Sequence, residues 1–560
     1  MILATDTRST NSAPALQGPP AVSSPTPLQG PPLPTVRAAS LWEALAGEPF
    51  SWLTFHIGTL ENETTLTQLR EAALTWAHGV TEALGHETPA RIGVLLPNGP
   101  DFVAAFFAAQ ALGAAAVPLP WPVVDGAPER VRESLEPVLQ RAKLSALITT
   151  PSMATVAWGV PLITAPGTQL ATPRPTGPDG TAFIQFTSGS TGDPRGAVIS
   201  QRAALASATS MGAALGLGPA DVGVSWLPFF HDMGLVGVLL TSLLARFPVH
   251  VLRPGDFLMR PRKWLDLVSS TRATLTVGPN FAWELVTRRV APEGLDLSAL
   301  RCALNGSEPI HRTTLDGFSK KFAAAGFNPA AMLPVYGLAE ATLGVAFSRP
   351  GALREDVLVE GRPIPSNGPL VPGMELRVLD AEGVAVPEGT QGELCVRAPM
   401  VMGGYFEHPE ATAAALRDGW LHTGDLGVVR DGNVYVTGRE KELVIQSGRK
   451  FHPYDIERVV AGMVDATPNG VAAVSRPDAA QGSEALVVVI ELRRVSGAID
   501  PMLIRGELLK VLGVRADVVE FVAAGALPRT TSGKVKRRAV AQGLADLLTH
   551  APVVTGAGNA

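Results

Sequence analysis

A long alternation of short apolar runs and helical segments constrains the fold of this chain most. Between about residues 40 and 380, apolar runs such as 91–96 and 146–150 alternate with segments of helical periodicity, such as 101–112 and 129–142. Short apolar runs of this kind are typical of strands that are buried on both faces. Their alternation with helices favours parallel sheets covered by helices, so the sequence predicts an α/β fold here.

The pattern changes after about residue 380. Shorter, turn-rich strands follow, such as 392–397 and 433–437, then a charged segment at 439–442 and a compact α+β stretch. We therefore expect a large N-terminal domain with parallel sheets covered by helices plus a small β-barrel-like subdomain, and a small, mobile C-terminal α+β domain. The predicted divisions are a tail at 1–38, an N-terminal domain at 39–440, a C-terminal lid at 441–548 and a loose end at 549–560.

The N-terminal tail is rich in Pro, Ser, Thr and Gly, and the string Leu-Gln-Gly-Pro-Pro occurs in it twice, at 16–20 and 28–32. A segment of this composition buries too little apolar surface to order itself, so we expect a disordered tail. We also expect deletion of residues 2–37 to leave the melting temperature and the activity nearly unchanged. The tail lacks a positive start followed by an apolar core, so it is not a secretory signal.

Composition excludes several classes of protein. Of 560 residues, 46% are hydrophobic and 17% are charged, with a net charge of -5, which argues against nucleic-acid binding. The two cysteines, Cys302 and Cys395, are far apart and predict buried strand residues, with no disulfide framework and no metal cluster; this fits a reducing cytoplasm. The most apolar stretch, 102–117, is short for a membrane span of about 20 residues. It predicts a buried helix running into a strand, not a transmembrane segment.

One glycine- and hydroxyl-rich motif occupies residues 186–196 and follows an apolar run that predicts a strand. Its glycines let backbone N–H groups turn inward around an anion, and its hydroxyls add donors to phosphate oxygens. No Gly-Lys-Ser/Thr ends it, so it is not a Walker P-loop. Taken alone, it could also be a flexible Ser/Gly linker.

Three further motifs follow: residues 336–342 (Tyr-Gly-Leu-Ala-Glu-Ala-Thr), 423–427 (Thr-Gly-Asp-Leu-Gly) with Gly438-Arg439 after it, and 528–534 (Pro-Arg-Thr-Thr-Ser-Gly-Lys). Each has an ordinary explanation: Tyr336 as a core aromatic, Asp425 as a turn residue, Lys534 as a solvated charge. Together, in this order, the four motifs resemble those of the adenylate-forming superfamily, which contains acyl-CoA synthetases, luciferases and peptide-synthetase adenylation domains. The resemblance covers about residues 40–545.

A finer resemblance is to fatty acyl-AMP ligases, which typically deliver the acyl adenylate to the phosphopantetheine thiol of an acyl carrier protein. It rests on the strings at residues 225–235, 257–265, 278–282 and 305–309, and on Ala339 where most of the superfamily has Thr. The chain departs from the superfamily at the end of its first motif, where Asp-Pro-Arg-Gly stands in place of a lysine-containing string. It is also shorter between residues 342 and 375, where fatty acyl-AMP ligases carry an insertion thought to hinder CoA. We expect the acceptor to be a separate carrier protein in preference to free CoA, which stays the alternative because of this shortened segment.

The resemblance implies that ATP and Mg²⁺ activate a small-molecule carboxylic acid, whose carboxylate attacks the α-phosphorus in line while pyrophosphate leaves. It implies that Glu340 holds Mg²⁺, that Tyr336 stacks on adenine, that Asp425 binds the ribose, that Arg439 supports ribose or phosphate, and that Lys534 bridges the carboxylate and the α-phosphate. The implied ATP- and AMP-binding residues are Thr187, Ser188, Gly189, Ser190, Thr191, Gly192, Arg195, Gly306, Ser307, Glu308, Tyr336, Gly337, Ala339, Asp425 and Arg439; Lys534, His231 and Glu340 are the implied catalytic residues.

The remaining implied residues concern the acyl group and the hinge. His231 lies where relatives gate the acyl pocket, and Trp226, Met233, Gly278 and Phe281 are its candidate lining, which favours a hydrophobic acid. Lys441 fits the hinge about which the C-terminal domain turns between half-reactions. Asp232 lies near the amine-binding Asp of amino-acid-activating relatives, so an amino- or aryl-acid enzyme stays a minor alternative. So does an inactive acyl- or nucleotide-binding relative, against which the intact motifs argue.

We expect Lys534→Ala to cripple adenylate formation but to spare thiol transfer from a preformed acyl-AMP, because the ammonium contacts developing charge only in the first half-reaction. Loss of one such group typically costs about 10²–10³-fold in rate. Pyrophosphate release by the variant measures the first step. Release near the wild-type rate would contradict the role given to Lys534.

Overall fold

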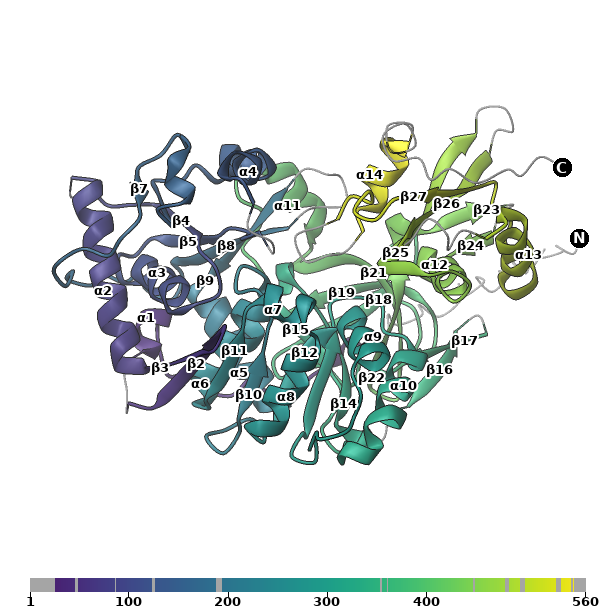
Figure 1. Cartoon of the computed structure of the whole chain (residues 1–560), viewed down its shortest axis with the longest axis horizontal. Helices are drawn as coiled ribbons and strands as arrows, with labels where there is room; N and C mark the ends of the chain where they lie inside the picture. The colour runs from purple at the N-terminus through teal and green to yellow at the C-terminus, as the bar shows by residue number, and fades with distance from the viewer. Residues whose placement is uncertain are drawn as a thin grey trace, which may run out of the picture.

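The computed structural model of this chain describes residues 26–45, 49–85, 87–122, 126–187, 194–352, 355–359, 361–446, 449–478, 483–493, 499–529, 535–544 and 547. Two large sheets and their covering helices form the N-terminal part, and a smaller α+β unit forms the C-terminal part (Figure 1). None of the described helices combines the length and apolar character needed to cross a bilayer.

The first large sheet has six strands, and only its edge pair β8–β9 is antiparallel. Side chains of β4 alternate between two layers, with Ile92 and Val94 in one hydrophobic cluster and Leu95 in another. Helix α3 packs in the first layer and α4 in the second, so helices cover both faces. In order across the sheet, its strands are β7 (Leu162–Ile163), β6 (Ala146–Thr149), β4 (Arg91–Leu95), β5 (Ala115–Pro118), β8 (Thr181–Thr187) and β9 (Arg195–Ser200).

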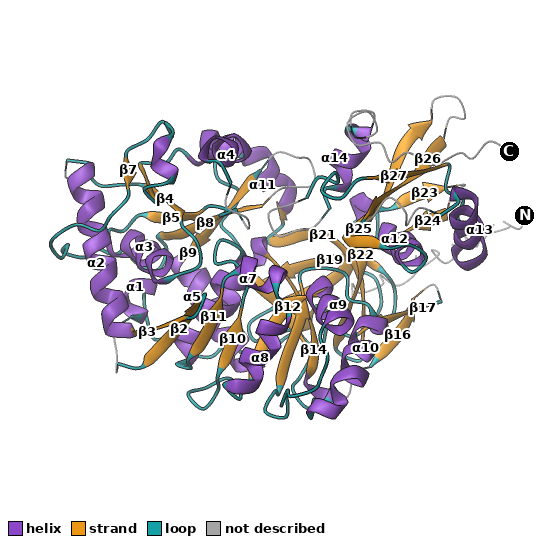
Figure 2. Cartoon of the chain, in the orientation of Figure 1, coloured by secondary structure: helices purple, strands orange, loops and turns teal. Residues whose placement is uncertain are grey.

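The second large sheet has eight strands, of which the six inner ones are parallel and the two edges antiparallel. Helices α8 and α9 contact this sheet, and α10 packs on α9 (Figure 2). Helix α5 contacts the sheet at β15, and η2 contacts it at β15 and β10. In order across the sheet, its strands are β15 (Leu343–Phe347), β14 (Met332–Leu338), β13 (Cys302–Gly306), β12 (Leu275–Pro279), β10 (Gly223–Ser225), β11 (Val249–Leu252), β2 (Ser51–Ile57) and β3 (Leu60–Thr65).

Local sequence explains where several helices begin. Thr65 and Gln68 form a capping box at the start of α2, and Pro100 and Pro128 occupy the first turns of α3 and α4, where the missing N–H costs nothing. The α-helices of the described residues, with the π-helix η2, are α1 (Leu41–Ala44), α2 (Leu66–Ala83), α3 (Pro100–Ala111), α4 (Pro128–Ala142), α5 (Gln201–Ala214), η2 (Met233–Leu240), α6 (Thr241–Ala245), α7 (Pro254–Met259), α8 (Arg262–Ser270), α9 (Asn280–Arg289), α10 (Arg312–Phe322), α11 (Pro409–Ala415), α12 (Pro453–Ala461), α13 (Pro501–Leu512) and α14 (Arg537–Gln542). The 3₁₀ turns are η1 (Met153–Thr155), η3 (Ala323–Ala325), η4 (Pro329–Ala331), η5 (Ala339–Ala341) and η6 (Glu440–Glu442).

The turn-rich region forms an antiparallel sheet whose described strands run in an open path from β1 to β20. Its strands are β1 (Leu28–Gln29), β18 (Glu375–Leu379), β19 (Gly392–Arg397), β21 (Trp420–Arg430) and β20 (Leu416–Arg417), with β22 (Asn433–Arg439) paired to β21. A separate hairpin, β16 (Asp356–Val359) and β17 (Arg362–Pro365), precedes it in the chain.

The structure differs from the expected tail over residues 26–38. Leu28 and Gln29 pair with β18, the Gly30 N–H donates to the Met374 carbonyl, and Leu33 packs on the main core. The segment is ordered because the edge of β18 supplies its hydrogen-bond partners and the main core supplies apolar surface for Leu33. The composition of the segment alone does not indicate these distant partners. The first copy of the repeat, at 16–20, lies outside the described residues.

The C-terminal part has its own hydrophobic clusters on the two faces of a three-stranded sheet. Ile456 of α12 and Ile504 of α13 belong to one cluster, and Val540 of α14 belongs to the other. The strands here are β23 (Val444–Gln446), β24 (Arg449–Phe451), β25 (Ala466–Asp478), β26 (Ser483–Leu492) and β27 (Val518–Val522).

Other expectations are confirmed within a residue or two. The apolar stretch 102–117 forms the almost wholly buried helix α3 and then β5, and both Cys302 and Cys395 are buried strand residues. The strand expected at 392–397 is β19 with the same bounds.

Deletion of residues 2–37 should lower the melting temperature by roughly a few degrees, because it removes strand β1 and the packing of Leu33. A shorter deletion of residues 2–25 is the matched control, since it keeps that docked segment. Scanning calorimetry of both proteins measures the difference, and equal melting temperatures would show that docking adds no stability.

Candidate functional site

A cavity of about 1230 Å³ lies between the N-terminal and C-terminal parts of the chain. Its wall includes the end of β8, the end of β14, the turn η5, and the adjoining strands β21 and β22. Residues of α12, β25 and α14 complete the wall from the C-terminal side. Described residues of three sequence motifs, at 186–196, 336–342 and 423–427, therefore converge here. Of the fourth motif, residues 530–534 lie outside the described residues, and Val535 directly after it lines the cavity.

One polar group in this wall is centred on the buried carboxylate of Asp425. Its Oδ2 accepts a hydrogen bond of 2.8 Å from the Tyr336 hydroxyl, and its Oδ1 accepts one of 2.7 Å from Nε of Arg439. Burial, with the Asp425 charge beside it, raises the pKa of Tyr336, so the phenol stays neutral. The same carboxylate raises the pKa of Arg439. The group is held as an ion pair plus one neutral donor.

Strand pairing produces this arrangement. Asp425 and Arg439 are cross-strand partners in the β21–β22 hairpin, so their side chains meet across one register position. Tyr336 comes from β14 of the eight-stranded sheet. Thr423 fixes the turn, because its hydroxyl donates to the Leu394 carbonyl and accepts from the Asp425 N–H.

A second polar group is built around Glu340, which lies on η5 directly after β14. The Tyr405 hydroxyl donates to Glu340 Oε1 at 2.7 Å, and the Arg195 guanidinium lies 5.5 Å from the Tyr405 ring centre. Burial and the Glu340 charge raise the pKa of Tyr405. All three side chains line the cavity, and Nε of Arg195 is buried without a hydrogen-bond partner there. Sequence reasoning missed Tyr405, whose Gly-Gly-Tyr-Phe context gave no chemical signal.

Close backbone approaches shape the segment between these two groups. A Cβ on Gly337 would lie 1.9 Å from the Leu343 carbonyl oxygen, and one on Gly306 would lie 2.7 Å from Val335 Cγ2. Ser307 adopts φ 71°, an uncommon value for a residue with a side chain. Ser307, Glu308, Gly337 and Ala339 line the cavity, whereas Gly306 lies behind them at the end of β13.

The cavity also has an apolar arm that sequence reasoning did not identify. Its walls come from α5, the π-helix η2 and the sheet strands beside them; the lining residues include Met211, Leu215, Leu217, Gly237, Thr241, Leu275, Val277, Leu343 and Phe347. Leu275 begins β12, and Val277 of the same strand and Asn280 directly after it also line the cavity, so the cavity extends along this strand. Nothing in the periodicity of α5 distinguished these residues from ordinary core.

The predicted acyl-pocket residues occupy two layers. Met233 and Phe281 line the cavity. Trp226 lies behind, stacked on Phe257 with ring centres 4.0 Å apart and edge-on to Phe281 at 6.2 Å. Gly278 is also behind the wall, where a Cβ would lie 3.1 Å from Trp264.

His231 and Asp232 both reach the cavity wall and are engaged with each other. His231 Nδ1 lies 2.6 Å from Asp232 Oδ1, and the same carboxylate oxygen accepts the Met233 N–H at 2.7 Å. Asp232 therefore caps the start of η2. The Asp232 carboxylate therefore has a structural role at the start of η2, unlike a carboxylate that serves only to bind a substrate amine.

Part of the predicted site lies outside the described residues: Ser188, Gly189, Ser190, Thr191, Gly192 and Lys534. Thr187 and Arg195, which flank the glycine-rich loop, are cross-strand partners at the loop end of the β8–β9 hairpin. The backbone of Lys441 lies in η6, immediately after Arg439.

The C-terminal part contacts the N-terminal part through polar side chains at the cavity. Asn469 Nδ2 donates to Glu308 Oε1 at 3.2 Å, while Glu308 Oε2 accepts the Phe281 N–H at 3.0 Å. Arg362 also pairs with Asp455 of α12. Burial, helped by nearby Arg458, lowers the pKa of His311 at this junction to about 4, so His311 is neutral at pH 7.

Comparisons with known proteins agree with this picture. The family described as AMP-binding enzyme matches residues 53–406. A Caulobacter vibrioides protein provisionally named an acyl-CoA synthetase is 33% identical over 521 residues, which cover 86% of this chain and 90% of that protein. A long-chain-fatty-acid–AMP ligase of Mycobacterium marinum is 33% identical over 515 residues, covering 80% and 86%. A structure from a study of fatty acyl-adenylate ligases of E. coli and L. pneumophila superposes with a TM-score of 0.81 at 29% identity, covering 92% of this chain and all of that one.

Proposed function

This chain belongs to the AMP-binding enzyme family, and we propose that it converts a fatty acid and ATP to acyl-AMP and pyrophosphate, then passes the acyl group to the phosphopantetheine thiol of an acyl carrier protein. The observation that carries the proposal is the shape of one cavity. It joins two polar groups suited to a nucleotide to an apolar arm suited to a hydrocarbon chain.

The polar groups suit the two ends of ATP. Asp425 presents a fixed carboxylate to the ribose hydroxyls, and Tyr336 offers a ring face to adenine. Arg195 and the glycine-rich loop beside it supply donors for phosphate oxygens. Bringing a carboxylate up to a polyphosphate places two anions together, so the guanidinium charge offsets part of the repulsion.

Glu340 is the proposed Mg²⁺ residue, and its setting fits a hard cation. Its carboxylate faces the cavity, and the Tyr405 hydroxyl donates to one oxygen, which fixes orientation while leaving further acceptor capacity. Mg²⁺ commonly uses one or two carboxylates, water and substrate phosphates, and supplies charge neutralisation at the phosphates. Lys534 would then bridge the carboxylate and α-phosphate, as the family resemblance implies.

The apolar arm indicates the class of acid. Met211, Leu215 and Leu275 offer hydrocarbon contacts along its length, and desolvating a fatty chain there gains about 0.8 kcal/mol for each buried CH₂. The Asp232 carboxylate accepts the Met233 N–H at the start of η2 and contacts His231. It therefore gives no support to the alternative that the enzyme activates amino acids. His231, at the junction of the arm and the polar groups, is a proposed positioning group for the carboxylate end.

Free CoA is the second candidate acceptor. The chain between β15 and β18 holds one short hairpin, β16–β17, and one relative is provisionally named an acyl-CoA synthetase. Both acceptors present the same phosphopantetheine arm, so selectivity must come from contacts beyond that arm.

Asp425→Asn should raise the KM for ATP by about 10- to 100-fold, because it removes the charge that aligns Arg439 and weakens charge-assisted bonds of about 1.5–3 kcal/mol. Tyr336→Phe, which keeps the ring, should have a smaller effect. Tyr435→Phe is the control, since Tyr435 is also buried but lies outside the cavity wall. ATP–pyrophosphate exchange measures all three, and unchanged KM in Asp425→Asn would contradict the ribose role.

Gly237→Val should shift the preferred substrate to shorter acids, because even a Cβ at this position would lie 2.9 Å from Leu343 Cδ2 across the arm. Gly317→Val on α10, outside the cavity wall, is the matched control. Steady-state kcat/KM across a series of fatty acids provides the measurement. A uniform loss at every chain length would place the acyl chain elsewhere.

Product analysis tests the whole proposal. The protein is incubated with ATP, Mg²⁺, a series of fatty, aryl and amino acids, and either CoA or a phosphopantetheinylated carrier protein. We expect acyl-AMP from fatty acids and transfer to the carrier. Efficient acyl-CoA formation at micromolar CoA with no carrier transfer would assign the second acceptor, and no adenylate from any acid would overturn the proposal.

A further inference from the structure

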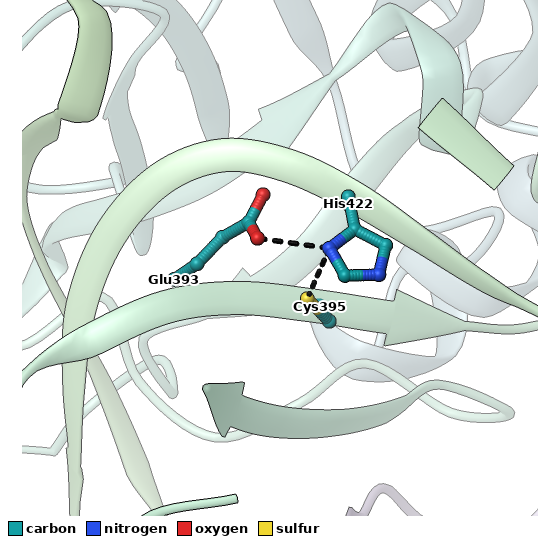
Figure 3. A group of neighbouring side chains, drawn as sticks. All are labelled: Glu393, Cys395 and His422. Carbon is teal, nitrogen blue, oxygen red and sulfur yellow. Dashed lines mark hydrogen bonds and ion pairs between the residues drawn. The ribbon is translucent and has the colours of Figure 1, made fainter. Parts of the chain in front are cut away.

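Three side chains with metal-ligating atoms meet beside the nucleotide-binding strand (Figure 3). Glu393 and Cys395 come from β19, two positions apart, and His422 is the cross-strand partner of Cys395 on β21. His422 Nδ1 lies 3.3 Å from Cys395 Sγ and 2.8 Å from Glu393 Oε2, and all three ligand atoms lie within 4.8 Å of one another. The sequence analysis predicted no metal cluster, because the spacing of these residues shows no metal-binding motif. His422 lies 27 positions after Cys395 and 29 after Glu393, and only strand pairing brings them together.

One ring nitrogen in this cluster has more partners than its chemistry allows. Besides Cys395 Sγ and Glu393 Oε2, His422 Nδ1 lies 2.6 Å from Nη2 of Arg417. A ring nitrogen either donates or accepts, so it cannot at once accept from a guanidinium and donate to a carboxylate. Arg417 also lies 3.9 Å from Glu393 Oε2, and its side chain is 54% exposed. It can therefore turn into solvent and leave three electron-pair donors facing one point.

We propose that Glu393, Cys395 and His422 form a binding site for a divalent ion of the zinc class, with Arg417 as the displaceable cation that occupies it otherwise. Around Zn²⁺ with bonds of roughly 2.0–2.3 Å, tetrahedral ligand atoms lie about 3.3–3.6 Å apart. The two separations from His422 Nδ1, 3.3 Å to Cys395 Sγ and 2.8 Å to Glu393 Oε2, lie within about 0.5 Å of that geometry. Glu393 and His422 line the cavity, from which water can supply the fourth ligand.

The ligand set separates this site from the Mg²⁺ position proposed at Glu340. A thiolate and an imidazole select Zn²⁺ or Co²⁺, whereas Mg²⁺ prefers oxygen ligands. A metal ion is ligated by the thiolate, so binding would displace the Cys395 thiol proton, which passes to solvent.

A metal ion bound at this site would affect the position of Asp425, the proposed ribose-binding residue. His422 lies three residues before Asp425 on β21, and Glu393 Oε1 accepts the Gly424 N–H at 3.0 Å. An ion at this point therefore ties β19 to the turn that carries Asp425. The inference does not depend on which acid or acceptor the enzyme uses.

Co²⁺ titration of the full-length, nucleotide-free protein tests the site, because thiolate ligation gives a near-ultraviolet charge-transfer band. We expect one equivalent of Co²⁺ to produce the band, excess Zn²⁺ to remove it, and Mg²⁺ to leave it unchanged. Cys395→Ser should lose the band and Cys302→Ser should keep it. These are the only two cysteines in the chain, so the assignment is unambiguous.

Cys395→Ser could lose the band because it misfolds, so two further variants test the site independently. Glu393→Gln, which retains the thiol, should keep the band and weaken Co²⁺ binding at least tenfold. Arg417→Ala should tighten binding, which mere structural damage would not do. No band in the wild type, a band that survives Cys395→Ser, or weaker binding by Arg417→Ala would overturn the proposal.

Discussion

The buried carboxylate of Asp425 is the interaction on which the site depends. It joins β14 of the eight-stranded sheet, through Tyr336, to the β21–β22 hairpin, through Arg439. A buried charge is costly unless it is paired and hydrogen-bonded, and here both oxygens are engaged. Two sheets of different architecture are thereby fixed relative to each other at the point where a nucleotide would have to touch both.

The same contact lies at the start of the connection to the C-terminal part. Arg439 ends β22, and the next residues form η6 and lead into β23. The ion pair with Asp425 therefore anchors the last residue of β22 to β21 just before this connection. Gly438 has φ +155°, and a Cβ there would lie 2.2 Å from His452 Nδ1, so a glycine lets the two parts of the chain pack closely at this junction.

The sequence predicted the helices and strands that follow from the pattern of their own residues. It did not predict those that form only through contact with a segment distant in the chain. The helix and strand within residues 102–117 follow from their own apolar pattern, and the motif residues from 336 to 342 and from 423 to 427 meet because each follows or lies on a buried strand. Strand β1 depends on the edge of β18, more than 300 residues away, and its composition argues for disorder. The apolar arm combines ordinary core residues such as Met211 and Leu275, whose exposure to a cavity depends on packing between elements.

Glu308 links helix α9 to the C-terminal part. Its Oε2 accepts the Phe281 N–H in the first turn of α9, and its Oε1 accepts from Asn469 of the C-terminal part. A shift of α9 to accommodate an acyl chain would move the carboxylate that Asn469 contacts. The Arg362–Asp455 pair is a second polar contact between the two parts, with both side chains about 20% exposed. Because the pair is mostly buried, removing one partner would leave a poorly solvated charge, so this contact favours the closed packing of the two parts. Glu308 links that packing to the position of α9, whereas the Arg362–Asp455 pair does not involve α9.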